Sequence, residues 1–331
     1  MCRWKKLFLV ICFPAILLMA CNQEKDLTEV ELAEVTRSIF YAPQYVALSE
    51  GFFEDEGLDV ELTTTWGGDT TMTALLSDGA DIALVGAETS MYVYAQEAND
   101  PPINFAQLTK TDGTFLVSRE PVENFEWEDL KGTSFLGQRQ GGMPQMVGEH
   151  VLRLNGIDPH EDLGELIQNI DFGNIPSAFA SGTGDYVQLF EPQATLFEEE
   201  GIGHIVDSFG TQSGEIPYTV YMAKQSFIDE DVETIENFTR AIYRAQQWIE
   251  EEDATTVAEA IEPFFDDTTL DVIEQVFIRY RDQGSYATSP LLSEDGWYLL
   301  QEIMDESGEL PMDIDYDELV NREVADKITE E

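Results

Sequence analysis

From residue 35 onward, short β-branched and aromatic runs alternate with segments of helical periodicity. The runs at 35–40, 58–64 and 81–85 have the composition of strands, and apolar residues at i, i+3 and i+4 indicate helices over 44–54 and 69–77. Strand, helix and strand in this order predict βαβ units, whose strands are parallel. The sequence therefore predicts an α/β fold.

The same pattern occurs twice before the chain becomes helical. A strand at 115–117 closes the first set, a second set begins at 134, and a further strand covers 218–223. We expect lobe 1 to hold residues 35–117 and 215–331, and lobe 2 to hold 118–214. Two chain crossings between lobes make a hinge, and ligands of open α/β sheets bind at the carboxyl ends of strands. We thus expect a ligand cleft between the lobes. The helices expected in the last third of the chain cover residues 232–250, 255–265, 270–280 and 294–306.

The N-terminus has the features of a secretory signal. Basic residues Arg3, Lys5 and Lys6 precede an apolar run at 7–19, which is shorter than the ~20 residues of a membrane-spanning helix. We predict a signal peptide over 1–20. The exit Leu18-Met19-Ala20-Cys21 resembles a bacterial lipobox, in which the Cys carries a diacylglycerol; an ordinary signal peptide with a coincidental Cys is the alternative.

A lipid on Cys21 predicts a protein held on the extracytoplasmic face of the cell membrane. Residues 21–34 are polar and acidic, and we expect them to form a flexible tether. The other two cysteines, Cys2 and Cys12, lie inside the signal, so a disulfide scaffold and Cys-based chemistry are excluded.

Charge excludes another class of partner. The chain carries 17 Lys and Arg against 66 Asp and Glu, a net charge of −49, and removing the three basic residues of the signal leaves about −52. Such a surface repels phosphate backbones, so we expect no nucleic-acid binding. High net charge often accompanies disorder, but 43% apolar and 11% aromatic residues can supply a core.

Four segments carry a resemblance to a known family. GFFEDEGLDVEL (51–62), LLSDGADIALVGAETS (75–90), DLKGTSFLGQRQGG (129–142) and FEP (190–192) resemble the solute-binding proteins for nitrate, sulfonates, taurine and thiamine-pyrimidine precursors. The resemblance implies a two-lobed periplasmic-binding-protein fold of type II and a small-molecule ligand. It further implies ABC permease and ATPase subunits as partners. We also expect a monomer and no cofactor.

Candidate ligand-binding residues of lobe 1 follow the predicted strands. Tyr41 can stack on a planar ligand or cap the core, and Trp66 offers an aromatic wall. Gly67 and Gly68 allow a ligand to approach backbone N–H groups at a helix start, whereas Asp69 is explained by capping.

A third loop of lobe 1 repeats this arrangement. Glu88, Thr89 and Ser90 follow the strand at 81–85, and the two hydroxyls can bind a ligand or cap the helix.

In lobe 2 the candidates are Arg139, Asp185, Tyr186 and Glu191. Arg139 can pair with an anionic ligand or with a neighbouring acid, and pairing with an acid is preferred. Related sequences place Glu-Pro near the ligand, which implies a role for Glu191. A buried carboxylate beside an anionic ligand costs several kcal/mol. Acids and aromatic residues together therefore favour a neutral or weakly cationic planar ring, such as a thiamine-pyrimidine precursor, over a sulfonate or another small anion.

Other functions are less consistent with the sequence. His150, His160 and His204 have no metal-ligand spacing, and no GxSxG motif occurs, so we expect neither a metal nor catalytic residues. The resemblance also covers an enzyme branch that makes the thiamine pyrimidine with a Cys-rich motif, which this chain lacks. A sensor that uses the fold without transport stays open, and a structural lipoprotein would not need Gly-rich turns after successive strands.

Overall fold

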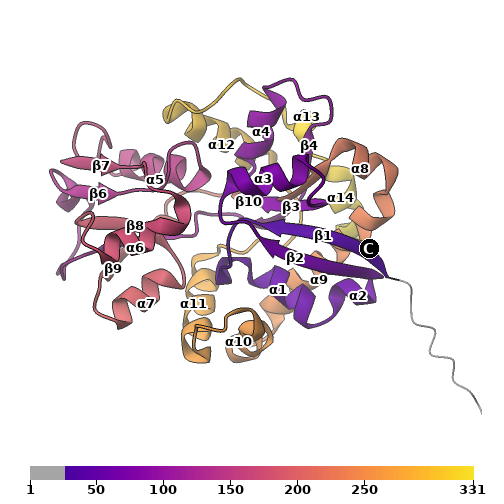
Figure 1. Cartoon of the computed structure of the whole chain (residues 1–331), viewed down its shortest axis with the longest axis horizontal. Coiled ribbons are helices and arrows are strands. Elements are labelled where there is room, and N and C mark those ends of the chain that lie inside the picture. The colour runs from indigo at the N-terminus through magenta and orange to yellow at the C-terminus, as the bar shows by residue number, and fades with distance from the viewer. Residues whose placement is uncertain (1–26) are drawn as a thin grey trace, which may run out of the picture.

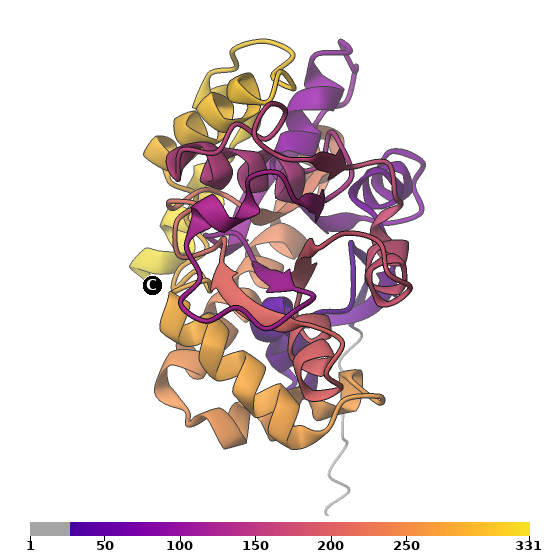
Figure 2. The same cartoon turned by 90° about the vertical axis from the view of Figure 1, so that its left-hand side faces the viewer.

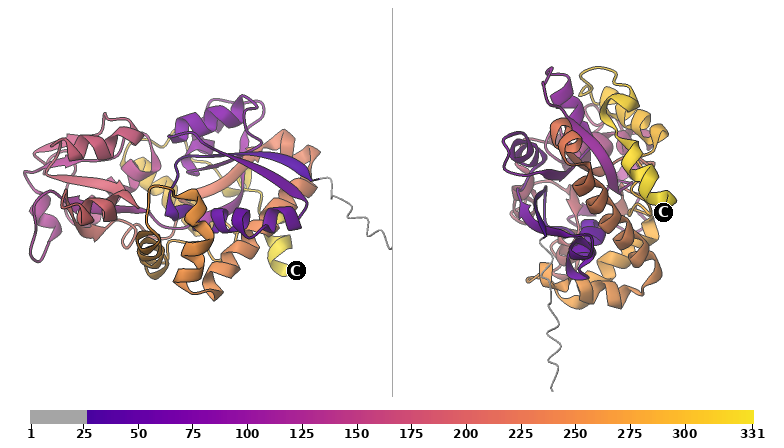
Figure 3. Two further views of the ribbon diagram at one scale, coloured as in Figure 1. Left: turned by 60° about the horizontal axis from the view of Figure 1, so that its bottom comes forward. Right: turned by 90° about the vertical axis from the view of Figure 1, so that its right-hand side faces the viewer.

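A computed structural model describes residues 27–331 as two β-sheets with helices on both (Figure 1). Lobe 1 contains the sheet with strand order β2-β1-β3-β10-β4, and lobe 2 contains the sheet β7-β6-β8-β5-β9. The sheets follow one another along the long axis of the molecule, as the left panel of Figure 3 also shows. The predicted two-lobed α/β fold is confirmed.

The strands are short and mostly buried. In lobe 1 they are β1 (Thr28–Glu34), β2 (Leu58–Thr64), β3 (Ile82–Val85), β4 (Pro102–Thr109) and β10 (Thr219–Lys224). In lobe 2 they are β5 (Thr114–Ser118), β6 (Ser134–Leu136), β7 (Glu165–Ile167), β8 (Tyr186–Phe190) and β9 (His204–Ser208). Strands β1, β2 and β3 are mutually parallel, as are β6, β7 and β8, whereas β10 and β5 run antiparallel to their neighbours.

The helices of lobe 1 cover both faces of its sheet. Because the chain moves from β1 to β2 on one side and then to β3 on the other, the right-handed crossover rule places the connecting helices on opposite faces. The helices of the first half are α1 (Ala42–Ser49), α2 (Phe52–Asp55), α3 (Gly68–Leu76) and α4 (Glu88–Tyr94). Figure 1 shows α3 above the sheet and α1 below it. Strand β2 lies on one side of β1 and β3 on the other, so the direction in which the chain adds strands to the sheet reverses after β2. This reversal puts a crevice at the carboxyl end of β1.

The remaining helices include those expected from the last third of the chain. Lobe 2 holds α5 (Met143–Leu154), α6 (Ile175–Ala180) and α7 (Gln193–Glu199). The C-terminal set comprises α8 (Gln225–Glu230), α9 (Val232–Glu251), α10 (Ala254–Ile261), α11 (Leu270–Gln283), α12 (Glu294–Glu306), α13 (Tyr316–Leu319) and α14 (Arg322–Glu330). Short 3-10 turns cover Ile39–Tyr41, Trp127–Leu130, Phe172–Asn174 and Glu262–Phe264. The four helices expected there match α9 to α12, and none within 27–331 is long and apolar enough to cross a membrane.

The first strand corrects two predictions. Residues 28–34, expected in the flexible tether, form β1, and residues 35–40, expected as a strand, form a loop and a 3-10 turn. Val30 and Leu32 are buried while Glu29 and Glu31 are exposed, which is the period-2 pattern of a half-buried strand. The acidic residues at alternate positions make the segment resemble a polar tether, and the strand was not predicted for this reason. Residues 1–26, with the predicted signal peptide, Cys21 and the first part of the predicted tether, lie outside the described residues.

The lobe boundary also differs from the prediction. Strand β5 belongs to the sheet of lobe 2, so the first crossing lies at 110–113 rather than after 117, and the second at 209–218. Helix α11 also lies at the junction (Figure 1), where Tyr280 Oη donates a hydrogen bond to the Gly113 carbonyl oxygen at 2.8 Å. Figure 2 looks along the long axis, with lobe 2 in front of lobe 1. Asp112 is fully buried in the first crossing and accepts a hydrogen bond from Thr114 N–H at 2.6 Å.

Candidate ligand-binding site

The carboxyl ends of both sets of parallel strands border one cavity of about 980 Å³. Lobe 1 contributes the loops after β1, β2 and β3, which run through Thr36, Trp66–Thr70 and Gly86–Thr89. Lobe 2 contributes the loops after β6 and β7, through 138–144 and 171–172, and the end of β8. Since parallel strands of each sheet point their carboxyl ends at this junction, the predicted cleft lies where the strand directions require it.

Aromatic side chains form much of the wall. Tyr41 is 4% exposed, Trp66 is 58% exposed at the cavity wall, and Phe172 packs on Phe190 with ring centroids 5.7 Å apart. Trp66 has a positive φ of 61°, a conformation that non-glycine residues rarely adopt and that persists at functional sites. Tyr218 completes the set. Planar ligands have faces on which such rings can stack.

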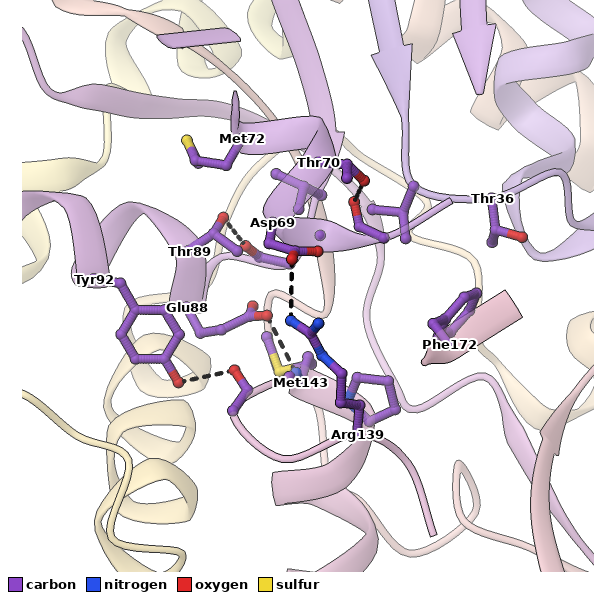
Figure 4. A pocket seen from close by; sticks show the side chains of 18 of the residues that line it. Thr36, Asp69, Thr70, Met72, Glu88, Thr89, Tyr92, Arg139, Met143 and Phe172 are labelled. Atoms are coloured by element: carbon purple, nitrogen blue, oxygen red, sulfur yellow. Dashed lines mark hydrogen bonds and ion pairs between the residues drawn. The ribbon is translucent and has the colours of Figure 1, made fainter. Parts of the chain in front are cut away.

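Glu88 is the most deeply buried acid of the cavity wall. Its Oε1 accepts a hydrogen bond from the Met143 N–H of lobe 2 at 3.1 Å (Figure 4). Burial raises the pKa of its carboxyl to about 7, against the opposing effect of the hydrogen bond from Met143 and of the nearby backbone N–H groups of Glu88 and Thr89. A Cβ at Gly86 would overlap its Oε2, so glycine at this position leaves room for the carboxylate.

Arg139 pairs with acids on both sides of the cavity. Its Nη2 lies 3.1 Å from Asp69 Oδ2 in lobe 1 (Figure 4), and its Nη1 lies 4.0 Å from Asp171 Oδ1 in lobe 2. The expected pairing with a neighbouring acid is present. Asp69, expected to cap α3, instead lies in the first turn after the N-cap Gly67 and points at Arg139.

Seven of the eleven predicted ligand-binding residues line the cavity: Tyr41, Trp66, Gly67, Gly68, Glu88, Thr89 and Arg139. The Thr89 hydroxyl donates to the Gly86 carbonyl oxygen at 2.7 Å, which stabilises the turn before α4. This is not the helix cap considered as its alternative, because a cap accepts from a backbone N–H. Ser90, Asp185, Tyr186 and Glu191 do not line it.

Ser90 faces the interior of lobe 1. Its hydroxyl accepts a hydrogen bond from Asn104 Nδ2 at 2.9 Å and donates to the Ala87 carbonyl oxygen at 2.7 Å. One residue beyond Thr89 on a helix is a rotation of about 100°, which turns Ser90 from the cavity into the core.

Asp185 and Tyr186 lie at the wrong end of β8. The strand runs from Tyr186 to Phe190, so its carboxyl end reaches the cavity while its start faces away. The Asp185 carboxylate accepts hydrogen bonds from Ser134 N–H and Oγ at 2.8 and 2.7 Å, and Tyr186 packs on Phe125.

Glu191 is enclosed by protein. Its carboxylate pairs with Arg279 of α11 and accepts hydrogen bonds from Thr195 N–H and Oγ1 at 2.8 and 2.9 Å, with the side chain fully buried. Burial raises the pKa of this carboxyl, opposed by the Arg279 charge. The carboxylate therefore stabilises the junction of lobe 2 with α11.

Sequence reasoning missed several wall residues. Phe190 follows from the strand-end rule once β8 is given its direction, and Tyr92 lies one helical turn after Glu88. Thr36 was missed because β1 was placed too late in the chain. Met72, Gln138, Met143 and Phe172 carry no local signal that distinguishes them from core or loop residues.

Comparisons with known proteins agree with this geometry. The model of the NMT1-like family matches residues 24–262. YtlA of Bacillus subtilis (strain 168), which is named as a binding protein, is 63% identical over 333 residues, 99% of each chain.

Solved structures show the same fold at low identity. The alkanesulfonate-binding protein SsuA from Xanthomonas axonopodis pv. citri, bound to MOPS, has a TM-score of 0.73 at 14% identity, with 89% of this chain and 98% of that chain covered. The periplasmic nitrate-binding protein NrtA from Synechocystis PCC 6803 has a TM-score of 0.70 at 16% identity, covering 92% and 89%. The desulfurization enzyme DSZB has a TM-score of 0.66 at 12% identity, covering 92% and 99%. The chain therefore belongs to the NMT1-like family, and its fold is the two-lobed α/β fold of the periplasmic binding proteins.

Proposed function

We propose that this protein is the extracytoplasmic solute-binding component of an ABC importer. The observation that carries the proposal is the cavity between the lobes, because both lobes supply its walls and a ligand can therefore hold them together. The close relative YtlA is named as a binding protein, and the sulfonate- and nitrate-binding proteins share the fold. The partners would be a permease and its ATPase, and the protein would act as a monomer.

The proposed ligand is a neutral or weakly cationic planar ring, such as a thiamine-pyrimidine precursor, in preference to a sulfonate, taurine or nitrate. Tyr41, Trp66 and Phe172 provide faces for a ring. Arg139, the only arginine that residues 27–331 contribute to the cavity wall, is already paired with two acids, so it is not free for an anion. Desolvating an anion beside buried Glu88 would be unfavourable.

The proposed mechanism is a shift between open and closed arrangements of the lobes. The contact of Glu88 with Met143 and the pair of Arg139 with Asp69 both join the lobes across the cavity. A third contact is the bond from Tyr92 Oη to the Gly141 carbonyl oxygen, at 3.2 Å. A ligand that touches both walls favours the closed form, which would then dock on the permease. No covalent step is involved.

We also propose that Cys21 carries a lipid that holds the protein on the outer face of the cell membrane. Tethering raises the local concentration of receptor near its transporter. Replacement of Cys21 by Ala should release the protein from membranes into the medium, whereas retention on the membrane would contradict the proposal.

The deciding experiment is mass spectrometry of the protein purified natively, to detect a co-purified solute, followed by thermal unfolding with that solute. A ligand at 100 times its Kd should add ~2.7 kcal/mol to the free energy of unfolding. Conversion of the bound solute to a new product would instead favour an enzyme. Normal solute uptake in cells that lack the protein would favour a sensor.

A further inference from the structure

The N-terminus of α5 has the chemistry of an anion site, but its remaining backbone N–H donor, that of Met143, already has an acceptor. This twelve-residue helix begins at the cavity after Gly141-Gly142, and helix N-termini bind anions through free backbone N–H groups. Pro144 has no N–H, and the N–H groups of Gln145 and Met146 donate to the Gly142 carbonyl oxygen at 3.0 and 3.2 Å. The Met143 N–H remains, and Glu88 of lobe 1 accepts its hydrogen bond.

The Glu88 carboxylate thus takes the position that a sulfonate or nitrate oxygen would need at this helix. The residue is 4% exposed, and its second oxygen, Oε2, has no hydrogen-bond partner among residues 27–331. A buried acceptor without a hydrogen-bond partner lowers stability, so an occupant that donates to Oε2 recovers that loss. An anion cannot, because it has no hydrogen to donate and carries the same charge.

A second buried acceptor lies on the other wall. Gln138 of lobe 2 donates from Nε2 to the Gln188 carbonyl oxygen at 2.7 Å, which fixes the orientation of its amide. Its Oε1 has no partner in the described part of the chain, and the residue lines the cavity at 3% exposure. The unpaired acceptors come from different lobes, so a ligand with two N–H donors can satisfy one on each.

We propose that Glu88 is a built-in anion that sets specificity: it closes the α5 N-terminus to anionic solutes and, with Gln138, selects a ligand bearing N–H donors. The class is an amino-substituted nitrogen heterocycle or an amidine. This inference rests on the proposed solute-binding function and names its ligand class. It separates this chain by chemistry from proteins of the same fold whose ligands are sulfonate or nitrate.

The test compares two probes, ethanesulfonate and 4-aminopyrimidine, by titration calorimetry at pH 8 with the full mature chain. Glu88→Ala removes the carboxylate from the N-terminus of α5. We expect this variant to bind ethanesulfonate at least tenfold more tightly than the wild type. Glu88→Gln keeps the oxygen that accepts from Met143 but removes the charge, and we expect it to bind 4-aminopyrimidine at least tenfold more weakly. Melting temperatures of both variants verify that they fold.

Glu318→Ala serves as the charge-matched control, because Glu318 lies outside the cavity wall and its carboxylate accepts a hydrogen bond only from Tyr94 Oη among the described hydrogen bonds. Its affinities should stay within twofold of the wild type. Equal ethanesulfonate affinity in wild type and Glu88→Ala would overturn the inference, and so would undiminished 4-aminopyrimidine binding by Glu88→Gln. If the wild type binds no solute at all, the proposed function fails, and the ethanesulfonate comparison still decides the role of Glu88.

Discussion

Arg139 of lobe 2 and Asp69 of lobe 1 face each other across the cavity, with 3.1 Å between Nη2 and Oδ2. Both side chains are about half exposed, so solvent screens the pair and its worth is about 0.2–1 kcal/mol. The pair therefore acts as a weak latch that a ligand can reinforce and that thermal motion can open.

A double-mutant cycle tests this latch. Asp69→Asn, Arg139→Gln and the double variant should show a coupling energy of up to ~1 kcal/mol in the affinity for the co-purified solute, decreasing at 1 M salt. The cavity-lining Thr70 has no charge, and Thr70→Ala combined with Arg139→Gln is the additive control. Additivity of Asp69→Asn and Arg139→Gln would show that the latch does not contribute.

Glu191 should matter for stability rather than for affinity. Glu191→Ala leaves Arg279 beside a buried vacancy, and breaking a buried pair in this way costs about 3 kcal/mol. We expect urea unfolding to shift accordingly while the solute Kd stays within twofold. Glu199→Ala, on the exposed end of α7, is the control and should change neither. A large loss of affinity at unchanged stability would restore Glu191 to the binding site.

The hinge residue Asp112 predicts a pH dependence of stability. Burial raises its pKa to about 6 from an ordinary value of 3.8, so folding favours the protonated form. The contribution to stability is full below pH ~3.8 and is lost as pH rises through ~6. Asp112→Asn should therefore raise the free energy of unfolding at pH 8, by on the order of 1–3 kcal/mol, and add little at pH 4.

A matched acid with the opposite shift provides the control for Asp112. Hydrogen bonds from Ser134 lower the pKa of Asp185, so its contribution is present above pH ~4 and lost in acid. Asp185→Asn should decrease stability at pH 8. An identical pH profile for both variants, measured by urea unfolding at pH 4 to 8, would contradict the burial of Asp112.

Glu88 predicts a pH dependence of binding. A ligand that donates to the carboxylate binds its ionised form, and the pKa of this carboxyl is about 7. Burial raises the pKa values of Tyr41, Tyr92 and Tyr218 around it, so these phenols stay neutral between pH 6 and 8. Affinity for a non-titrating N–H donor should increase about tenfold from pH 6 to 8, and the profile of Glu88→Gln should be flat.

Trp66 should contribute to the binding free energy of the ligand. If the ligand covers its ring, Trp66→Ala should weaken binding by about 1–3 kcal/mol, measured by calorimetry, without lowering the melting temperature. Tyr298 is 41% exposed and lies outside the cavity, so Tyr298→Ala should leave the affinity unchanged. Equal affinities for wild type and Trp66→Ala would remove Trp66 from the site.

Local features of the sequence predicted much of the fold. Gly57 ends the helical segment that contains Phe53, and its φ of +85° is the conformation that a glycine before a strand predicts. Phe53 packs on Phe238 in the core, with ring centroids 4.9 Å apart. Such features depend on neighbours within a few residues. The loops that carry Trp66, Glu88 and Arg139 were found for the same reason, since each directly follows a strand.

Short-range periodicity and turn chemistry predict the alternation of strands and helices, the two lobes and the loops that can border a cleft. Which side chains of those loops face the cavity depends on how distant segments pack. Glu191 is one residue beyond the cavity-lining Phe190, yet Arg279, 88 positions away, holds it in the interior. Glu88 acquires its role from Met143, 55 positions away. Contacts at such separations depend on how the lobes pack, and no local pattern encodes them.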